Sequence, residues 1–147
     1  FDDDPSMRKR AQMAGGALGR FLYRYLNASQ RLIMPSAYGD RRRLTPTIHR
    51  QYLSVFPDPD SREQVLFPLA QSLLRSSRYF QSLWDRRGRL AAVPMSVLWG
   101  ERDSAFQLPI LERWQGTFPH ARVVRFPDAG HWPHEEVPAA FCAALTD

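Results

Sequence analysis

Two polar residues in the last third of the chain follow short apolar runs, and their types suit acid–base chemistry. Asp103 follows the run 94–99 and a turn, and His131 follows the run 121–126 and another turn. Ligands of open α/β sheets bind beyond the carboxyl ends of the strands, so we expect both side chains at one sheet edge. A carboxylate that holds an imidazole selects its tautomer and stabilises its cation. The acid followed by the histidine therefore predicts a supported general base that serves a nucleophile held elsewhere.

Each of the two residues also has a structural alternative. A helix cap is the alternative role of Asp103 or of its neighbour Ser104, and a lone histidine such as His131 is more often structural than functional. Gly130 permits an unusual backbone conformation that aims the next side chain. The other histidines lie in a helix, in a turn and at a helix start, and they are His49, His120 and His134. No residue spacing fits a zinc site, a phosphate loop or an EF-hand, so we expect no metal and no cofactor.

The residues that follow position 93 read as alternating strands and helices. The run 94–99 lies between a proline and a glycine and is typical of a buried parallel strand. Residues 108–118 have one apolar helical face, residues 121–126 predict a second strand, and acidic residues open a terminal helix. We therefore predict an α/β fold in which residues 94–147 are a βαβα unit of a mostly parallel sheet.

The first 93 residues show helical patterns without a strand. We expect helices over 6–27, 45–57, 60–75 and 79–89. Gly15 and Gly16 weaken the first of these helices and predict a kink or a close contact there. Glu63 follows Asp60 at the spacing of a capping box, and Pro68 is expected to end or kink the third helix.

Composition limits the classes of partner. The net charge is +5, but all except one of the 20 basic residues are arginines. This indicates a general preference for arginine in the composition rather than a nucleic-acid surface. No apolar run is long enough to span a membrane, and the lone Cys142 is expected to be a buried, inert thiol. We expect a cytoplasmic protein without nucleic-acid or membrane partners. A membrane-surface role for the basic amphipathic helix 6–27 is a rival interpretation.

Two strands leave open edges and an uncovered face, so further strands are expected from outside these residues. The chain begins with neither an initiating Met nor a signal peptide, and we expect it to start inside a longer protein. No Ser or Asp is flanked by glycines two positions away on each side, the pattern of a nucleophile elbow. The sequence therefore predicts an acid and a base without their nucleophile, and an inactive chain when it is alone.

Several segments carry a family resemblance. Residues 99–103, 111–114, 118–121 and 128–138 closely resemble the C-terminal end of α/β-hydrolases, with most likeness to the haloalkane dehalogenase and epoxide hydrolase branch. The resemblance implies a helical cap over residues 1–93, inserted between the sixth and seventh strands, and hydrolase core over 94–147. It implies that Asp103 is the triad acid and His131 the base. His134 stands where Gln is frequent in the family.

The resemblance also implies a mechanism and a substrate class. The missing N-terminal half would supply a nucleophile that forms a covalent ester, and His131 would activate the water that hydrolyses it. An Asp nucleophile implies a haloalkane or an epoxide, and a Ser nucleophile implies a carboxylic ester. A small hydrophobic substrate would contact cap aromatics such as Phe21, Phe80 and Trp84, for which internal packing is the alternative. The non-enzyme alternative is an inactive, ligand-binding protein of the same fold.

Overall fold

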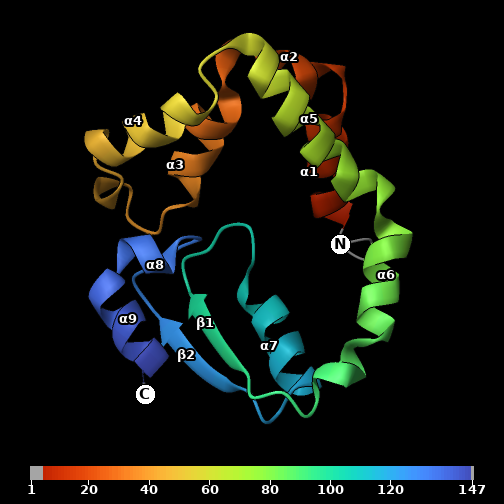
Figure 1. Cartoon of the computed structure of the whole chain (residues 1–147), viewed down its shortest axis with the longest axis vertical. Coiled ribbons are helices and arrows are strands. Elements are labelled where there is room, and N and C mark those ends of the chain that lie inside the picture. Colours follow the sequence, from red (N-terminus) through yellow and green to blue (C-terminus); the bar gives the residue numbers. More distant parts are fainter. Residues whose placement is uncertain (1–4, 147) are drawn as a thin grey trace. The chain divides into compact units, whose positions relative to one another are not determined.

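The computed structural model describes residues 5–146, which divide into two compact units. Within the described residues, the helical unit comprises residues 5–32 and 49–88, and the sheet unit comprises residues 33–48 and 89–146. The chain leaves the helical unit, contributes a short segment to the sheet unit, and then returns (Figure 1). This division does not coincide with a boundary at residue 93, because the short segment packs with the C-terminal part. The assignment of residues 1–93 as a cap stays a prediction.

The helical unit is built around α5. Its elements are α1 (Pro5–Gly15), α2 (Ala17–Leu26), most of the π-helical turn η1 (Ser29–Ile33), most of α4 (Pro46–Val55), α5 (Pro59–Arg75) and α6 (Ser77–Asp85). Helices α1 and α2 both pack against α5. The helix expected over 6–27 is broken because Gly16 adopts extended backbone, with φ −92° and ψ −177°. Among the described helices, none combines the length and the apolar character that a membrane crossing needs.

The capping box expected at the start of α5 is not present. Asp58, not Asp60, caps the helix, since its carboxylate accepts the Ser61 N–H at 2.8 Å. Glu63 does not close a capping box, because its carboxylate binds arginines of α2 instead. The helix runs through Pro68 to Arg75, which confirms the expected end near Arg75 and excludes an end at Pro68, while a kink at Pro68 stays a prediction. Packing of α5 against two other helices holds the helix together where local sequence preference would end it.

The sheet unit contains the predicted βαβα arrangement. Its elements are α3 (Met34–Ala37), the 3₁₀ turn η2 (Arg41–Arg43), the second half of another 3₁₀ turn, η3 (Arg87–Leu90), β1 (Ser96–Gly100), α7 (Leu108–Thr117), β2 (Arg122–Phe126), α8 (Pro133–Glu136) and α9 (Pro138–Thr146). Strands β1 and β2 pair in parallel, with Ser96 opposite Arg122 and Gly100 opposite Phe126. Helix α7 lies on one side of the strands and α9 on the other (Figure 1). The single terminal helix that the sequence predicts is divided into two helices, α8 and α9.

One core cluster of the sheet unit is formed by the strands and α9, while Leu111 on α7 and Phe118 after it are also buried. The buried residues of this cluster are Phe126, Ala129 and Ala144, with Leu98, Val124, Val137 and Phe141 packed around them. The side chain of Cys142 on α9 is exposed, so the expectation of a buried thiol is wrong. Most of α9 is apolar on several faces, and the apolar pattern alone does not indicate which face meets the sheet.

Candidate acid–base site

Asp103 is presented by the tight turn that follows β1. The Glu101 N–H donates to the Phe126 carbonyl at 3.0 Å, which extends the ladder beyond the strand end. The Arg102 N–H donates to the Ala129 carbonyl at 2.9 Å, and the Asp103 N–H returns to the Gly100 carbonyl at 3.3 Å. The turn after β1 is therefore bonded to the chain after β2. These bonds place both turns at the carboxyl ends of the parallel strands, where the sequence predicts a site.

The two oxygens of the Asp103 carboxylate have different partners. Oδ2 lies 2.8 Å from Nδ1 of His131, while Oδ1 accepts the N–H groups of Ala105 at 2.7 Å and Phe106 at 3.0 Å. Asp103 therefore both contacts the histidine and accepts main-chain N–H groups as a capping residue does. Asp103 caps the turn, although not the helix, because α7 begins later with Gln107 as its N-cap. The local bonds orient the carboxylate that faces the histidine.

His131 is fixed by its main chain as well as by Asp103. Its N–H donates to the Ala37 carbonyl at 2.9 Å, and its ring lies edge-on to Trp132 at a centroid distance of 4.8 Å. The side chain of His131 is 30% exposed, whereas that of Asp103 is 9% exposed. Because Nδ1 is engaged by Asp103, Nε2 is the ring nitrogen left for a reacting group. Both residues line a cavity of about 310 Å³, together with Leu98, Trp99, Gly100, Phe106, Gly130 and Pro133.

The electrostatics of the pair favour charge on both partners. Burial of the Asp103 carboxyl would raise its pKa, but hydrogen bonds from His131 and from two backbone N–H groups outweigh burial and leave the pKa below its usual value. The hydrogen bond to Asp103 is the main reason that the pKa of His131 lies above its usual value. Burial opposes that rise in pKa, and the charges of Asp103 and Glu136 support it. An imidazolium formed at His131 is therefore stabilised.

The residues that hold the His131 turn were largely missed by sequence reasoning. Segment 37–40 lies against this turn, although it precedes His131 by about ninety positions of sequence. The ring of Tyr38 stacks on Trp132, with centroids 5.2 Å apart, and its hydroxyl donates to Glu135. Gly130 does not adopt a positive φ, contrary to expectation, and instead allows the close approach of segment 37–40. The small residues of this segment were the only available signal.

The predicted substrate-contacting residues lie in the helical unit, and each of them contacts a different neighbouring side chain. Phe21 on α2 packs against Tyr25 with ring centroids 5.2 Å apart. Phe80 on α6 is 5.8 Å from Tyr79, and the Arg87 guanidinium lies 4.7 Å from the Trp84 ring. These residues stay candidates for substrate contact.

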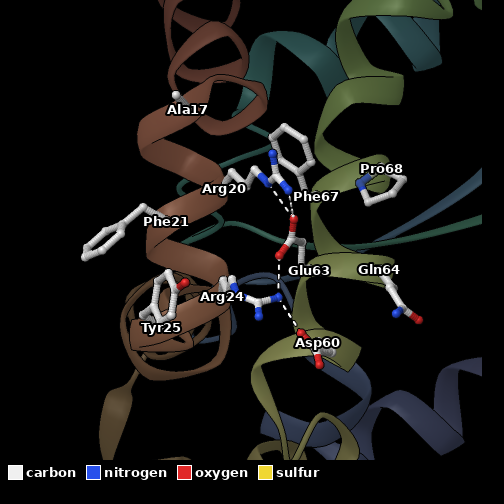
Figure 2. Close-up of a pocket in the computed structure, with 10 residues that line it drawn as sticks. All are labelled: Ala17, Arg20, Phe21, Arg24, Tyr25, Asp60, Glu63, Gln64, Phe67 and Pro68. Carbon is white, nitrogen blue, oxygen red and sulfur yellow. Dashed lines mark hydrogen bonds and ion pairs between the residues drawn. The ribbon is translucent and has the colours of Figure 1, made fainter.

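Phe21 lines a cavity of about 800 Å³ between α2 and α5. Figure 2 shows Glu63 in this cavity between Arg20 and Arg24, with the Phe21 ring turned away from the three charged groups. Asp60 extends the network through an ion pair with Arg24 at 2.5 Å. No group of three or more His, Cys, Asp or Glu able to hold a metal ion is present within the described residues.

Comparison with known proteins relates this arrangement to one family. Residues 4–144 match the sequence profile described as the Alpha/beta hydrolase family. A curated relative, cis-3-alkyl-4-alkyloxetan-2-one decarboxylase of Shewanella oneidensis, is 31% identical over 124 residues. The match covers 81% of this chain and 38% of that protein.

Solved structures share the fold at lower sequence identity. A mutant of DbjA superimposes with a TM-score of 0.79 at 19% identity, over 98% of this chain and 50% of that one. A loop variant of haloalkane dehalogenase DbeA from Bradyrhizobium elkanii gives a TM-score of 0.76 at 19% identity, over 96% of this chain and 48% of that one. The chain thus spans about half the length of these structures, and the likeness extends over nearly all of it.

Proposed function

Because the chain belongs to the alpha/beta hydrolase family, we propose that Asp103 and His131 are the acid and the base of a hydrolase that works through a covalent ester. The observation that carries the proposal is the 2.8 Å contact between Nδ1 of His131 and Oδ2 of a nearly buried Asp103, at the carboxyl ends of two parallel strands. The resemblance of residues 99–103 and 128–138 to the haloalkane dehalogenase branch favours a haloalkane as the substrate. The nucleophile lies outside these 147 residues.

The proposed reaction has two steps. A carboxylate nucleophile displaces halide from a substrate carbon and forms an alkyl ester. Nε2 of His131 then takes a proton from water, and the resulting hydroxide attacks the carbonyl carbon of the ester. Collapse of the tetrahedral intermediate breaks the acyl C–O bond, and the alkoxide leaves as the alcohol after it takes the proton from His131. Asp103 stabilises the imidazolium between these proton transfers.

The first-step chemistry depends on the absent nucleophile. With an Asp nucleophile, an epoxide would open to the same kind of ester, and with a Ser nucleophile a carboxylic ester would be the substrate. The Asp103–His131 pair supports all three reactions, because each of them hydrolyses an ester with base-activated water. A ligand-binding protein without chemistry is the outcome if none of these substrates turns over.

The 31% identity to an oxetanone decarboxylase favours a second candidate function. An oxetan-2-one is a four-membered cyclic ester, and its decarboxylation breaks two ring bonds to give carbon dioxide and an alkene. This net reaction consumes no water. The two candidates therefore differ in whether His131 must activate water.

The test uses the complete protein that carries this chain, offered a 1-haloalkane or a cis-3,4-dialkyl oxetan-2-one. We expect continuous halide release, and in His131→Ala a single equivalent of halide followed by an accumulated ester, detected as added mass on the protein. His134→Ala is the matched control, since His134 is exposed and contacts Phe141, and it should turn over normally. Normal turnover by His131→Ala would contradict the assignment, and alkene without halide would favour the second candidate.

A further inference from the structure

Glu136 is a buried carboxylate that the acid–base chemistry does not use. The residue is 5% exposed and lies at the end of α8. Its Oε1 accepts the Gly130 N–H at 2.8 Å, and its Oε2 accepts the N–H groups of Gly39 at 2.8 Å and Asp40 at 3.3 Å. One side chain therefore binds the main chain on both sides of the contact that holds His131.

The two segments that Glu136 joins touch each other directly. The His131 N–H donates to the Ala37 carbonyl at 2.9 Å. A Cβ at Gly39 would lie 2.7 Å from the Gly130 nitrogen and 2.8 Å from the Ala129 carbonyl carbon, so the two main chains leave no room for a side chain. The backbone of His131 is thus held between Ala37, on one side, and the Glu136 carboxylate, which fixes the preceding peptide.

The position of the Glu136 side chain requires a group that only accepts hydrogen bonds. All three groups that face the carboxylate are N–H donors, and an ionised carboxylate offers only acceptors. The side chain of Arg43 donates to the main-chain carbonyl of Glu136 at 2.9 Å, not to its carboxylate. An amide of the same shape would turn one N–H₂ group toward N–H donors and lose bonds on one side.

We propose that Glu136 is a positioning residue for His131, and that its carboxylate fixes the 130–131 backbone so that Nδ1 meets Asp103 and Nε2 stays the base. The proposal rests on the proposed function, since it gives Glu136 a task in that reaction. The residue acts through His131 and touches no reacting atom. The effect is geometric, with a smaller electrostatic part because a negative charge nearby favours the imidazolium.

Other charged groups near this turn have partners of their own. Asp103 faces the His131 ring from the turn after β1, and Glu136 lies on α8. Further charged or titratable groups of the segments packed here include Asp40 paired with Arg42, Glu101 paired with Arg125, Asp128 paired with Arg102, Glu135 bound by Tyr38, Arg43 bound to a carbonyl, and His134 beside Phe141. Replacement of Glu136 therefore removes a charge that, together with Asp103, supports the raised pKa of His131.

The test compares Glu136→Gln with Glu112→Gln in the complete protein labelled with ¹⁵N-histidine. Glu112 is exposed on α7, so its substitution makes the same change of charge away from the site. In Glu136→Gln we expect a lower pKa of the His131 imidazole and a loss of the Nδ1–H tautomer, while Glu112→Gln leaves both unchanged. Retention of the wild-type pKa and tautomer in a folded Glu136→Gln protein would overturn the proposal.

A second variant covers the case in which Glu136→Gln does not fold. Gly39→Ala disturbs the same contact from the other side and should cause the same change of the His131 tautomer, although it leaves the Glu136 carboxylate in place. If neither variant folds, amide hydrogen exchange of the wild type decides. Slow exchange at Gly39 and Gly130 supports the proposal, and fast exchange at either amide overturns it.

Turnover separates this proposal from the proposed function. Where the complete protein releases halide, Glu136→Gln should lower kcat by about 100-fold with little change of KM, because a small misplacement of a base is costly. Where the wild type shows no turnover, the proposed function fails, but the nuclear magnetic resonance result on His131 still stands. Unchanged kcat together with a changed tautomer would also overturn the positioning role.

Discussion

The sheet unit and the helical unit each contain a glutamate bound by several donors, yet the two arrangements differ in kind. Glu136 accepts N–H groups of the main chain and is 5% exposed. Glu63 accepts the guanidinium groups of Arg20 and Arg24, and the side chain of Arg20 is 60% exposed. Main-chain donors are fixed by the fold of their loops, whereas long arginine side chains must be ordered by the contact itself.

The difference indicates where geometry is held tightly. In the sheet unit, Asp103 and His131 are each bound through main-chain groups as well as to each other. In the helical unit, charged side chains link α2 to α5 across a cavity of about 800 Å³ (Figure 2). A site that needs side chains placed to a fraction of an ångström suits the first arrangement, while the second tolerates rearrangement of exposed side chains.

Among the variants that test this comparison, Gly100→Ala is expected to cause the largest loss of stability. A Cβ at the end of β1 would lie 2.7 Å from the Ala129 carbonyl oxygen and still closer to that of Gly130. Because both atoms belong to the main chain that carries His131, they cannot yield as a flexible side chain would. We expect a loss of about 3 kcal/mol in the free energy of unfolding of the sheet unit, measured by urea denaturation.

Gly116→Ala is the matched control in the same unit. Nothing lies within 4 Å of a Cβ at this position of α7, and alanine favours helix more than glycine does. We expect unchanged stability or a gain of up to about 1 kcal/mol. Equal losses in both glycine variants would mean that close main-chain contact does not set the geometry of the His131 turn.

Local sequence patterns were sufficient for the strands and for the meeting of Asp103 with His131. Strands β1 and β2, helix α7 and the parallel pairing follow from short apolar runs between breaking residues. The meeting of Asp103 and His131 follows from the general placement of ligands at strand ends. These inferences needed only a few neighbouring residues and one rule of topology.

Contacts between distant segments were beyond such patterns. Residues 37–40 read as part of a polar loop, and their types do not indicate which distant segment they pack against. Glu136 read as a favourable charge at a helix start, although its carboxylate is buried and binds two other segments. The continuation of α5 through Pro68 has a related cause, since tertiary packing holds the helix together across this residue.

Asp103→Asn tests how strongly the Asp103–His131 pair stabilises the fold, and we expect an intermediate loss of stability. The pKa of His131 is raised in the folded state, so its contribution is complete below the unfolded pKa of about 6.5 and is lost as pH rises through the folded pKa. The pKa of Asp103 is lowered, so its contribution is present above about 3.9 and is lost as pH falls through its folded pKa. Both contributions are therefore present together between about pH 4 and pH 6.5.

We expect the stability difference between wild type and Asp103→Asn to be greatest in that pH range, at about 1–2 kcal/mol. The difference should shrink above the folded pKa of His131, where only the neutral hydrogen bond remains. Urea midpoints measured at several pH values check the shape of this dependence. A difference that grows steadily above neutral pH would show that the charged pair does not stabilise the sheet unit.

Glu63→Gln is expected to have the smallest effect, and salt should distinguish it from Glu136→Gln. The Arg20–Glu63–Arg24 contacts are partly exposed, so ions screen them, and at about 1 M salt the screening length falls to about 3 Å. We expect a slight loss of stability in the helical unit at low salt and no loss at high salt. Thermal denaturation at the two salt concentrations measures this difference. The loss in Glu136→Gln should persist at both salt concentrations, because main-chain N–H groups left without an acceptor stay buried whatever the ionic strength. A loss in Glu63→Gln as large and as insensitive to salt would mean that the two units hold their glutamates in the same way.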